Sequence, residues 1–582
     1  MDFTYFNAVR TVENALSKVK DEKGMKRIEK FLTKGPCPAC HGTRFNERAL
    51  STKLMGKNIA EVCAMTLSEL VVWVQKIPGQ MPSEIEEMAQ SIVNDFLRTA
   101  ERLTNLGLSY LSLDRAGNTL SNGELQRVQI SRAVRSDTTG VLYVLDEPSI
   151  GLHPYNVDGL MKIVRELVDR KNSVVLVDHD PRILMDADQL IEIGPGAGKE
   201  GGRIVTQGTP LEAEKNPHSL IGPYLSGKES LKVRSRATEK DMFENGSIRI
   251  KTKPFYTVKA LDVSIPKGRM IAVTGVSGSG KTSLVIECLV PALQAVIQGT
   301  KLPEHVDSIE AKGIQSVKVI DSKPIGANVR STVATYDGVF DDLRKLFART
   351  ADAKAKGLTA GDFSYNTGKL RCPVCDGTGI ITMDVQFLPD VDTICPSCGG
   401  SRYGKDAYDI LWKSKEKDSV SVSLPGLLKL TVEEAAGILH EETKIAKQLK
   451  ILQDLGVCYL TLGEATPALS GGEAQRLKLA YEMETPQQGS VFVFDEPTIG
   501  LHPQDVKKLV LIFDHLIQLG ATVIVIEHDL ELVTNCDYII DMGPWGGTEG
   551  GRVVVEGTPE AVAATSESIT GRYLKQELAE DK

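Results

Sequence analysis

Short apolar runs that end in polar turns recur along the chain and predict the buried strands of an α/β protein. Met270–Thr274 runs into a glycine-rich turn, Val491–Phe494 into Asp-Glu-Pro, and Thr522–Ile526 into Glu-His-Asp. Runs of this length between turn residues are typical of strands inside a sheet. The helix-like stretch Ser283–Val290 follows the first run. The pattern therefore predicts alternating strands and helices, with polar turns at the strand ends.

The first of these turns carries a phosphate-binding motif. The motif reads G-x-x-x-x-G-K-T and consists of Gly275, Val276, Ser277, Gly278, Ser279, Gly280, Lys281 and Thr282. Glycines let successive backbone N–H groups surround phosphate oxygens, and the following helix N-terminus adds positive potential. Lys281 would reach the β- and γ-phosphates of ATP, and Thr282 would hold Mg²⁺. A plain glycine–serine turn is disfavoured by the strand–loop–helix context, so the motif predicts an ATP site.

A block of sequence occurs twice, which indicates that a whole domain is duplicated. A constant separation of 349 positions joins Ser121 to Ser470, Asp146 to Asp495, His179 to His528 and Gly208 to Gly557. The front ends of the two copies differ. Cys37 lies 358 positions before Cys395, and at that offset the counterpart of Gly275 would precede Met1 and that of Cys372 would be Asn14. The first copy is predicted to lack its phosphate loop and half of a cysteine cluster.

Composition and charge narrow the classes of protein. The 582 residues are 41% hydrophobic and 25% charged, which is ordinary globular composition, and their length predicts more than one domain. A net charge of −9 means that any surface for nucleic acid must be local. Met1–Arg10 has no secretory pattern and no run of about 18 apolar residues occurs, so we expect a cytoplasmic protein without a membrane span.

The polar residues after the apolar runs fit the chemistry of a nucleotidase. Asp495 would position Mg²⁺ and Glu496 would activate a water molecule, although a helix-starting turn is the alternative. His528 would contact the γ-phosphate or that water. A lone histidine is usually structural, but its repetition at His179 favours function. Leu469–Glu473 reads as a helix start with Ser470 as N-cap, and a capping box with nothing bound is the alternative.

Together these motifs resemble the ABC ATPase family: the phosphate loop, Leu-Ser-Gly-Gly-Glu at 469–473, Asp-Glu-Pro and Glu-His-Asp. Cysteine pairs between Lys281 and Ser470, together with Phe363–Asn366 and Asp146–His153, narrow the resemblance to the UvrA family, the damage-recognising subunits of the bacterial excinuclease ABC. The resemblance spans essentially the whole chain. It implies an α/β fold of two ABC-type ATPase lobes, the first incomplete, with inserted helical and zinc-binding signature domains.

The resemblance also implies a composite ATP site, because ABC ATPases hold the nucleotide between the phosphate loop of one lobe and the signature helix of the other. The site would combine the phosphate loop, Asp495 and the catalytic residues Glu496 and His528 with Ser121, Asn122, Gly123 and Glu124. Ser470–Glu473, Asp146 and Glu147 would serve a second site whose phosphate loop the chain lacks. Two positions depart from the family: Ser322 stands at a glutamine position, which weakens γ-phosphate sensing, and Asn122 replaces the first signature glycine.

Six segments follow from the repeat and the resemblance. We expect the remnant of a first inserted domain at 1–115, the C-terminal part of the first ATPase lobe at 116–225, a linker at 226–245, the P-loop part of the second lobe at 246–320, an inserted zinc and DNA-binding domain at 321–460, and the C-terminal part of the second lobe at 461–582.

The cysteines predict one structural zinc site. The spacing of Cys372, Cys375, Cys395 and Cys398 suits tetrahedral Zn²⁺ with no open position for catalysis, and a hairpin would join the two pairs. Cys37 and Cys40 form a single pair, for which His41 and Cys63 are conceivable further ligands, so metal at that pair stays open. The other thiols are expected to be core residues of a reducing compartment: Cys63, Cys288, Cys458 and Cys536.

The resemblance implies that ATP binding and hydrolysis gate the recognition of damaged duplex DNA in nucleotide excision repair, without nuclease activity in this chain. It implies a homodimer, and a UvrB-type helicase as a partner whose docking region would lie upstream of this sequence. Damage of many chemistries would be read through backbone contacts and duplex deformability. Candidate DNA-facing cations, each otherwise a solvated surface residue, are Arg44, Arg330, Lys369, Arg371, Arg402 and Lys405.

Three alternatives stay open. The chain could be a fragment, or the product of a mis-assigned start, of a normal repair protein. It could be a paralogue that binds DNA but does not load UvrB, for example one that protects its host from a DNA-damaging metabolite. It could also be an ABC protein that acts on ribosomes or on a transporter, which the four-cysteine insertion disfavours.

Overall fold

The computed structural model of the chain describes residues 9, 10, 12, 31, 32, 35–120, 122–134, 138–196, 201–229, 232–323, 325, 326, 328–383, 391–414, 420–483 and 487–580. Most of the helical segment predicted at 1–35 lies outside these residues, and the described Val9, Arg10 and Val12 are helical. The chain divides into two compact units. The smaller comprises 1–97 with 111–116, and the larger comprises 98–110 with 117–582.

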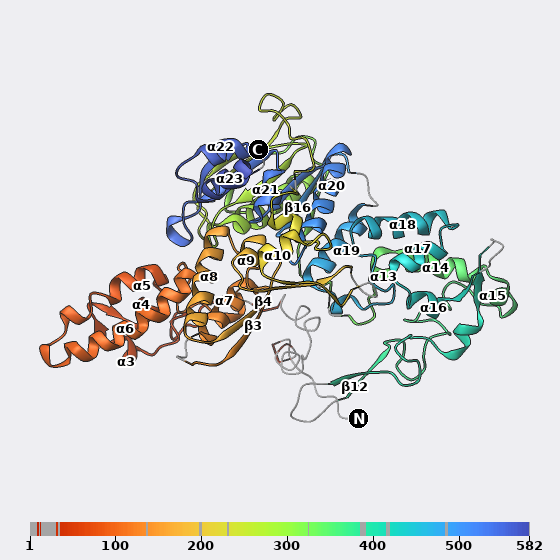
Figure 1. Ribbon diagram of the computed structural model, residues 1–582, viewed down its shortest axis with the longest axis horizontal. Coiled ribbons are helices and arrows are strands. Elements are labelled where there is room, and N and C mark those ends of the chain that lie inside the picture. Colours follow the sequence, from red (N-terminus) through yellow and green to blue (C-terminus); the bar gives the residue numbers. More distant parts are fainter. Residues whose placement is uncertain are drawn as a thin grey trace. The chain divides into compact units, whose positions relative to one another are not determined.

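The smaller unit is helical. Asn58 and Thr66 open α4 and α5 with reciprocal capping boxes, in which Glu61 and Glu69 bond back to the cap residue. Leu70 and Val74 of α5 pack against Val93 of α6, and Figure 1 shows these two helices side by side. The elements are α3 (Glu47–Leu50), β1 (Lys53–Leu54), β2 (Lys57–Asn58), α4 (Ile59–Cys63), α5 (Leu67–Val74), η1 (Pro78–Gln80) and α6 (Ser83–Asn105), which continues into the larger unit.

The second copy builds the main sheet of the larger unit, in the order β11-β16-β17-β9-β18-β19. Its neighbours are parallel except β18 and β19. The apolar runs predicted from sequence form buried strands, and β9, which leads into the phosphate loop, lies between β17 and β18. The strands are β9 (Met270–Thr274), β11 (Ser316–Ile320), β16 (Ser490–Asp495), β17 (Thr522–Ile526), β18 (Tyr538–Gly543) and β19 (Arg552–Gly557).

Helices and a small antiparallel sheet, in the order β10-β7-β8, complete this copy. Residues of that sheet, of β9 and of α12 share one hydrophobic core. The elements are β7 (Ser247–Thr252), β8 (Asp262–Pro266), η4 (Ser283–Leu289), α12 (Val290–Gln298), β10 (Val306–Glu310), η6 (Thr466–Ala468), α19 (Gly471–Met483), α20 (Pro503–Gln518), α21 (Leu530–Thr534), η7 (Gly547–Glu549), α22 (Pro559–Ala564) and α23 (Ile569–Glu580).

In the described part of the chain, the first copy has the corresponding strands but no strand between β4 and β5. β3 pairs with β4 in parallel, and β5 pairs with β6, but the two pairs form separate sheets in the described residues. One face of β3 and β4 packs on α8. The elements are η2 (Gly117–Thr119), α7 (Asn122–Ala133), β3 (Leu142–Asp146), α8 (Pro154–Asp169), β4 (Ser173–Val177), α9 (Pro181–Met185), β5 (Leu190–Gly194), β6 (Arg203–Gly208), α10 (Pro210–Lys215) and α11 (Gly222–Leu225).

A helical insertion with a cysteine hairpin lies between β11 and α19 in the sequence. Its helices pack against α19 and α20 through one core, and Figure 1 shows α14, α17 and α18 grouped beside α13. The elements are α13 (Val333–Asp337), α14 (Val339–Ala348), α15 (Ala351–Ala355), β12 (Ile380–Met383), β13 (Val391–Ile394), η5 (Lys405–Asp409), β14 (Leu411–Lys413), β15 (Ser421–Ser423), α16 (Leu424–Leu428), α17 (Val432–Ile438) and α18 (Thr443–Asp454).

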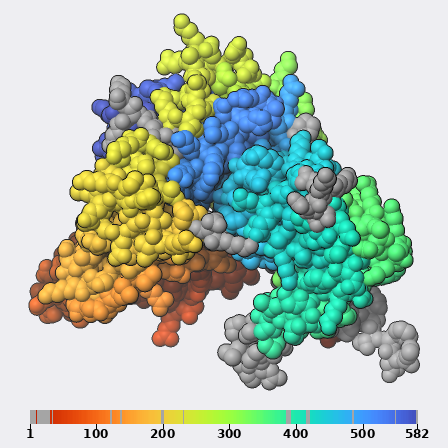
Figure 2. Space-filling view, turned by 45° about the vertical axis from the view of Figure 1, so that its right-hand side comes forward, coloured from red at the N-terminus to blue at the C-terminus, as the bar shows by residue number. Residues whose placement is uncertain are grey.

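The segment between the copies is anchored to the second one. Arg234 pairs with Asp514 of α20 at 2.8 Å and with buried Asp537 at 3.1 Å. The backbone N–H of Val233 donates to the side chain of Asn535 at 3.1 Å. In Figure 2, the yellow surface preceding this segment lies against the blue surface of the C-terminal residues. These bonds hold the end of the first copy on the second.

Candidate composite nucleotide site

The phosphate loop wraps around the side chain of Lys281. Gly275, Gly278 and Gly280 have φ values of 127°, 77° and 98°, a region that favours glycine. Lys281 is buried, and its Nζ donates to the carbonyl oxygens of Gly275 at 2.8 Å and Val276 at 3.0 Å. Burial lowers the pKa of Lys281 to about 8, against the opposing effect of nearby carboxylates. The ammonium group therefore lies at the centre of the loop, where a phosphate oxygen would meet it.

Asp495 and Glu496 lie at the end of β16, in the same sheet as the strand before the loop. Glu496 has a φ of 48°, an uncommon conformation for a residue with a side chain and one that occurs often at functional sites. Burial and the charge of Asp495 raise the pKa of Glu496 to about 7, and burial also raises the pKa of Asp495. Glu496 is thus poised to accept a proton near neutral pH.

His528 lies beside Glu496, with its Nε2 4.0 Å from the Oε1 of the glutamate. Burial, followed by the charge of Lys281, lowers the pKa of His528 well below 6.5, so the ring is neutral at physiological pH. Nδ1 of His528 is buried and has no hydrogen-bond partner among the described residues. A neutral imidazole with one spare nitrogen can accept or donate one further hydrogen bond.

The first copy contacts the phosphate loop directly. Arg127 of α7 donates to the Oγ of Ser277 at 3.2 Å. A Cβ atom at Gly151 would lie 2.7 Å from Oε2 of Glu496, so the backbone of the first copy lies directly against that carboxylate. Gly151 has a φ of 63°, so any other residue there would also be strained. The structure thus brings the start of α7 and the turn after Asp-Glu-Pro together with the second copy's loop.

The structure describes only some of the predicted signature residues of the first copy. Ser121 lies outside the described residues, and the side chain of Asn122 does too. Gly123 lies in the first turn of α7, with the carbonyl oxygen of Ile150 3.4 Å from the position of a Cβ atom. Glu124 is buried and accepts a hydrogen bond from the hydroxyl of Tyr110. Thr282 is exposed at the start of the helix after the loop.

Sequence reasoning missed the residues that join the two copies. Tyr110, Arg127 and Gly151 contact the second copy, and none was singled out from the sequence as a site residue. The repeat held a signal for each of them, because their counterparts at the constant separation of 349 are Tyr459, Arg476 and Gly500.

A buried polar chain connects the copies on the other side of the loop. Nε2 of His153, at the start of α8, lies 3.1 Å from the Oγ1 of Thr570. The hydroxyls of Thr570 and Thr274 donate to Asp541 at 2.6 and 2.8 Å. Thr274 is the last residue of β9, so the chain of bonds runs from α8 of the first copy to the strand that carries the phosphate loop.

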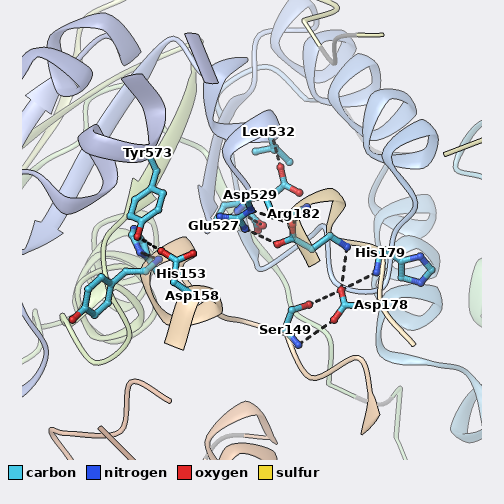
Figure 3. Close-up of polar contacts among 12 residues, drawn as sticks. Ser149, His153, Asp158, Asp178, His179, Arg182, Glu527, Asp529, Leu532 and Tyr573 are labelled. Carbon is cyan, nitrogen blue, oxygen red and sulfur yellow. Dashed lines mark hydrogen bonds and ion pairs between the residues drawn. The ribbon is translucent and has the colours of Figure 1, made fainter. Parts of the chain in front are cut away.

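The counterparts of Glu496 and His528 in the first copy lie in a similar arrangement. Glu147 has a φ of 45°, and its Oε1 lies 3.6 Å from Nε2 of His179. Asp178 accepts hydrogen bonds from the hydroxyl of Ser149 and from the backbone of His179, as Figure 3 shows. A cavity of about 380 Å³ lies between the two sets of residues and is lined by Glu147, His179, Glu496, His528 and their neighbours.

Ser322, expected from the resemblance to replace a glutamine, lies beside α19 of the second copy. A Cβ atom at Gly471 would lie 3.4 Å from the Cβ of Ser322. Its neighbour Asp321 pairs with Lys478 of α19 at 2.6 Å and with Lys323 at 3.4 Å. Burial is the larger cause of the raised pKa of Asp495, and the charge of Asp321 adds to it.

The four predicted zinc ligands lie together. Their sulfur atoms are all within 4.8 Å of one another, with 4.0 Å between Cys372 and Cys395 and 3.7 Å between Cys375 and Cys398. A tetrahedral Zn²⁺ with bonds of about 2.3 Å separates its thiolates by about 3.8 Å, so the donor set fits the metal. The stem of the predicted hairpin is present as β12 and β13, and its turn lies outside the described residues.

Within the described part of the chain, these four cysteines are the one group of His, Cys, Asp and Glu side chains compact enough for a metal ion. Cys37 is exposed, and neither His41 nor Cys63 completes a cluster with Cys37 and Cys40 there. The expectation of core thiols holds for Cys288 and Cys536, which are buried. It is wrong for Cys63 and Cys458, which are half-buried.

Most of the candidate DNA-facing cations have partners. Arg330 and Arg371 both pair with Asp376, at 3.2 and 3.0 Å, and Lys369 lies 3.6 Å from Asp362. Arg402 is buried, lies 5.2 Å from the ring centre of Tyr365 and donates to the carbonyl oxygen of Val329. Burial lowers its pKa, and its contacts are structural. Arg44 and Lys405 are exposed.

A phosphate loop on a central strand, an acidic pair on the same sheet and a helix of the first copy that contacts the loop define an ABC-type ATPase fold. The predicted α/β class is therefore confirmed. Among the described residues, no helix combines the length and the apolarity that crossing a lipid bilayer requires.

Comparison with known proteins identifies the family. No family model matches the chain. The UvrABC system protein A of Staphylococcus aureus (strain COL) is 42% identical over 561 residues, which cover 95% of this chain and 58% of that protein. The protein of the same name from Aquifex aeolicus is 40% identical over 574 residues, covering 98% of this chain and 61% of its own length. These curated relatives are therefore substantially longer than the present chain.

Comparison with solved structures also identifies a UvrA protein as similar to this chain. The crystal structure of UvrA2 from Deinococcus radiodurans superposes with a TM-score of 0.88 and 36% identity, covering 99% of this chain and 70% of that protein. The chain belongs to the UvrA family, which confirms the resemblance drawn from its motifs.

Proposed function

We propose that the chain is an ATPase that couples ATP binding and hydrolysis to the recognition of damaged duplex DNA in nucleotide excision repair. The observation that carries the proposal is the contact of α7 and Gly151 of the first copy with the phosphate loop and Glu496 of the second. ABC-type hydrolysis requires both sides of a composite site, and these contacts support such a site between the two copies.

The residues around the loop fit a nucleoside triphosphate. The Oγ of Ser279 is buried without a hydrogen-bond partner, and the ammonium group of Lys281 lies inside the loop. Lys281 would hold the terminal phosphates, and Thr282 with Asp495 would hold Mg²⁺. Bound Mg²⁺ would neutralise charge on the phosphate oxygens. These contacts would orient the γ-phosphate toward Glu496.

Glu496 would accept the proton of the attacking water. Its raised pKa, about 7, suits proton transfer near neutral pH. Neutral His528 would hydrogen-bond the γ-phosphate or that water and so orient it. Glu496 lies against the backbone of Gly151, so movement of the first copy would move the base. This contact gives a route by which the relative position of the copies sets the rate of hydrolysis.

Recognition of DNA is proposed from family membership and from the cysteine hairpin. Four thiols that fit Zn²⁺ hold the base of β12 and β13, which extend from the inserted domain. Such a hairpin can contact a duplex through its backbone without reading base edges. We propose a homodimer as the DNA-bound form.

Substitution of Lys281 tests the ATPase proposal. Lys281→Ala removes the ammonium group from the described phosphate loop, so turnover of ATP should fall at least about a hundredfold. Lys345 of α14 is exposed and pairs with Asp342, and it gives a matched control, Lys345→Ala, that should leave turnover unchanged. Equilibrium dialysis of wild type should saturate near one nucleotide per chain, and turnover near wild type in Lys281→Ala would contradict the proposal.

Titration with nucleic acids tests the proposed recognition of damaged duplex DNA. Damaged duplex should bind more tightly than undamaged duplex of the same sequence, with affinity that falls steeply as salt rises. Binding confined to ribosomes would overturn it. Damage-specific binding without recruitment of a UvrB-type helicase would favour the paralogue.

A further inference from the structure

Tyr110 lies in a groove formed by two loops of the second copy. A Cβ atom at Gly278 of the phosphate loop would lie 2.6 Å from Cδ1 of Tyr110, and one at Gly547 would lie 2.9 Å from its Cβ. The two loops are themselves joined, because the N–H of Gly547 donates to the carbonyl oxygen of Gly278 at 3.1 Å. The glycines therefore leave the space that the tyrosine ring fills.

The other end of the same side chain holds the signature helix. The hydroxyl of Tyr110 donates to Oε1 of Glu124, which lies in the first turn of α7 and is buried. A hydrogen bond to a carboxylate is among the stronger ones in proteins. One side chain of the first copy thus bridges its own signature helix and the phosphate loop of the second copy.

The repeat separates the two contacts of this side chain. Tyr459 occupies the equivalent position in the second copy, and its hydroxyl donates to Glu473 of α19 at 2.7 Å. The bond from tyrosine to the signature helix is therefore common to both copies. The ring of Tyr110 also contacts a phosphate loop. Tyr459 instead holds α19, and the described residues include no phosphate loop that would face α19.

We propose that Tyr110 is a positioning residue of the composite nucleotide site, one that holds the start of α7 at a fixed place over the phosphate loop. The proposal rests on the ATPase function proposed above and adds a residue to it. Arg127 makes the second described link from α7 to the loop, through Ser277, so the two residues together fix the helix at two points. Loss of one link lets the helix shift without detaching it.

Two substitutions separate the hydroxyl from the ring. Tyr110→Phe removes the bond to Glu124 and keeps the ring against Gly278, so kcat for ATP should fall about tenfold while the dissociation constant of an ATP analogue stays within about twofold. Tyr110→Ala also empties the groove beside the loop, so the analogue should bind about tenfold more weakly as well. Comparing the change in kcat with the change in KM distinguishes a positioning role from a general loss of folded protein.

Tyr459→Phe and Tyr459→Ala are the matched controls. They break the same kind of bond in the second copy, so their melting temperatures should fall as much as those of the Tyr110 variants. Their kcat and KM should stay within about twofold of wild type. Equal loss of turnover in both series, or unchanged turnover in Tyr110→Phe, would overturn the proposal.

Amide hydrogen exchange measured on the nucleotide-free chain tests the positioning role of Tyr110 independently of ATP hydrolysis. Tyr110→Ala should raise amide exchange in 275–282 and 122–133, and Tyr459→Ala should leave 275–282 unchanged. If wild type hydrolyses no ATP but exchange rises in this pattern, the ATPase proposal fails and the positioning role stands. Unchanged exchange in both segments would refute the positioning role regardless of activity.

Discussion

The two copies pair their equivalent strands in the same register but differ in what covers the strands. Val144 of β3 pairs with Val175 of β4, and their counterparts Val493 and Ile524 pair in the same way in β16 and β17. In the second copy, β9 lies beside β17, and both strands are fully buried. In the first copy, β4 has β3 as its described neighbour, and every other residue of the two strands is exposed.

This comparison shows which properties local sequence encodes. Glu147 and Glu496 have φ values of 45° and 48°, and each lies close to its own histidine. The turn that shapes a catalytic glutamate therefore forms with or without a phosphate loop nearby. Burial behaves differently: Val144 is 64% exposed, whereas Val493 is 0% exposed. Burial depends on the central strand and on the helix that follows it.

The cysteine pairs offer the test with the largest expected effect. Cys395→Ser removes one of four thiolates, so the chain should lose its zinc, measured as about one equivalent per chain by atomic emission. Cys37→Ser changes the single pair in the first copy, for which the described residues supply no further ligands, and the zinc content should stay at one. Two equivalents in wild type would show that both copies hold metal.

The paired glutamates test whether one copy alone performs catalysis. Glu496→Gln removes the proposed base and should lower kcat by about a hundredfold or more. Glu147→Gln changes the residue with the same backbone conformation in the first copy and should change kcat by less than about threefold. Steady-state hydrolysis under saturating ATP measures both. A similar loss in both variants would mean that the chain has two working sites.

The exposed and buried valines test the difference in packing. Val493→Ala deletes two buried methyl groups and should cost about 2 kcal/mol, which lowers the melting temperature. Val144→Ala should change stability by less than about 0.5 kcal/mol. Differential scanning fluorimetry compares the two. A large loss in Val144→Ala would show that the open face of β3 is covered in solution.

Sequence reasoning reached the fold class and the identity of the separate motifs, because each motif is local. It identified the phosphate loop, the acidic strand and the four cysteines, which the structure places as a loop after β9, the end of β16 and one sulfur cluster. It did not find Tyr110, Arg127 or Gly151, since their role depends on which surface of the other copy they meet. The repeat marks these three positions through their counterparts Tyr459, Arg476 and Gly500, but it does not show that they contact the other copy.

The same limit explains the misjudged cations and cysteines. Arg402 is expected to face DNA or solvent because it is charged, yet it is buried against the ring of Tyr365. Cys458 lies in an apolar stretch but is half-buried. Tyr365 and Val329, the neighbours that bury Arg402, lie well before it in the sequence of the inserted domain.

The pH dependence of hydrolysis gives the smallest expected effect. Burial raises the pKa of Glu496 to about 7, so the base is protonated at lower pH, and kcat/KM should fall about fivefold between pH 7 and pH 6. Burial lowers the pKa of Lys281 to about 8, so kcat/KM should also fall above pH 8 as the ammonium group loses its proton.

Bound phosphates favour the charged form of Lys281, so the fall above pH 8 should weaken or disappear in the profile of kcat. Because kcat/KM reports the free enzyme and kcat reports the complex, the two profiles separate the groups. A profile of kcat/KM that is flat from pH 6 to pH 8 would contradict the assignment of Glu496 as the base.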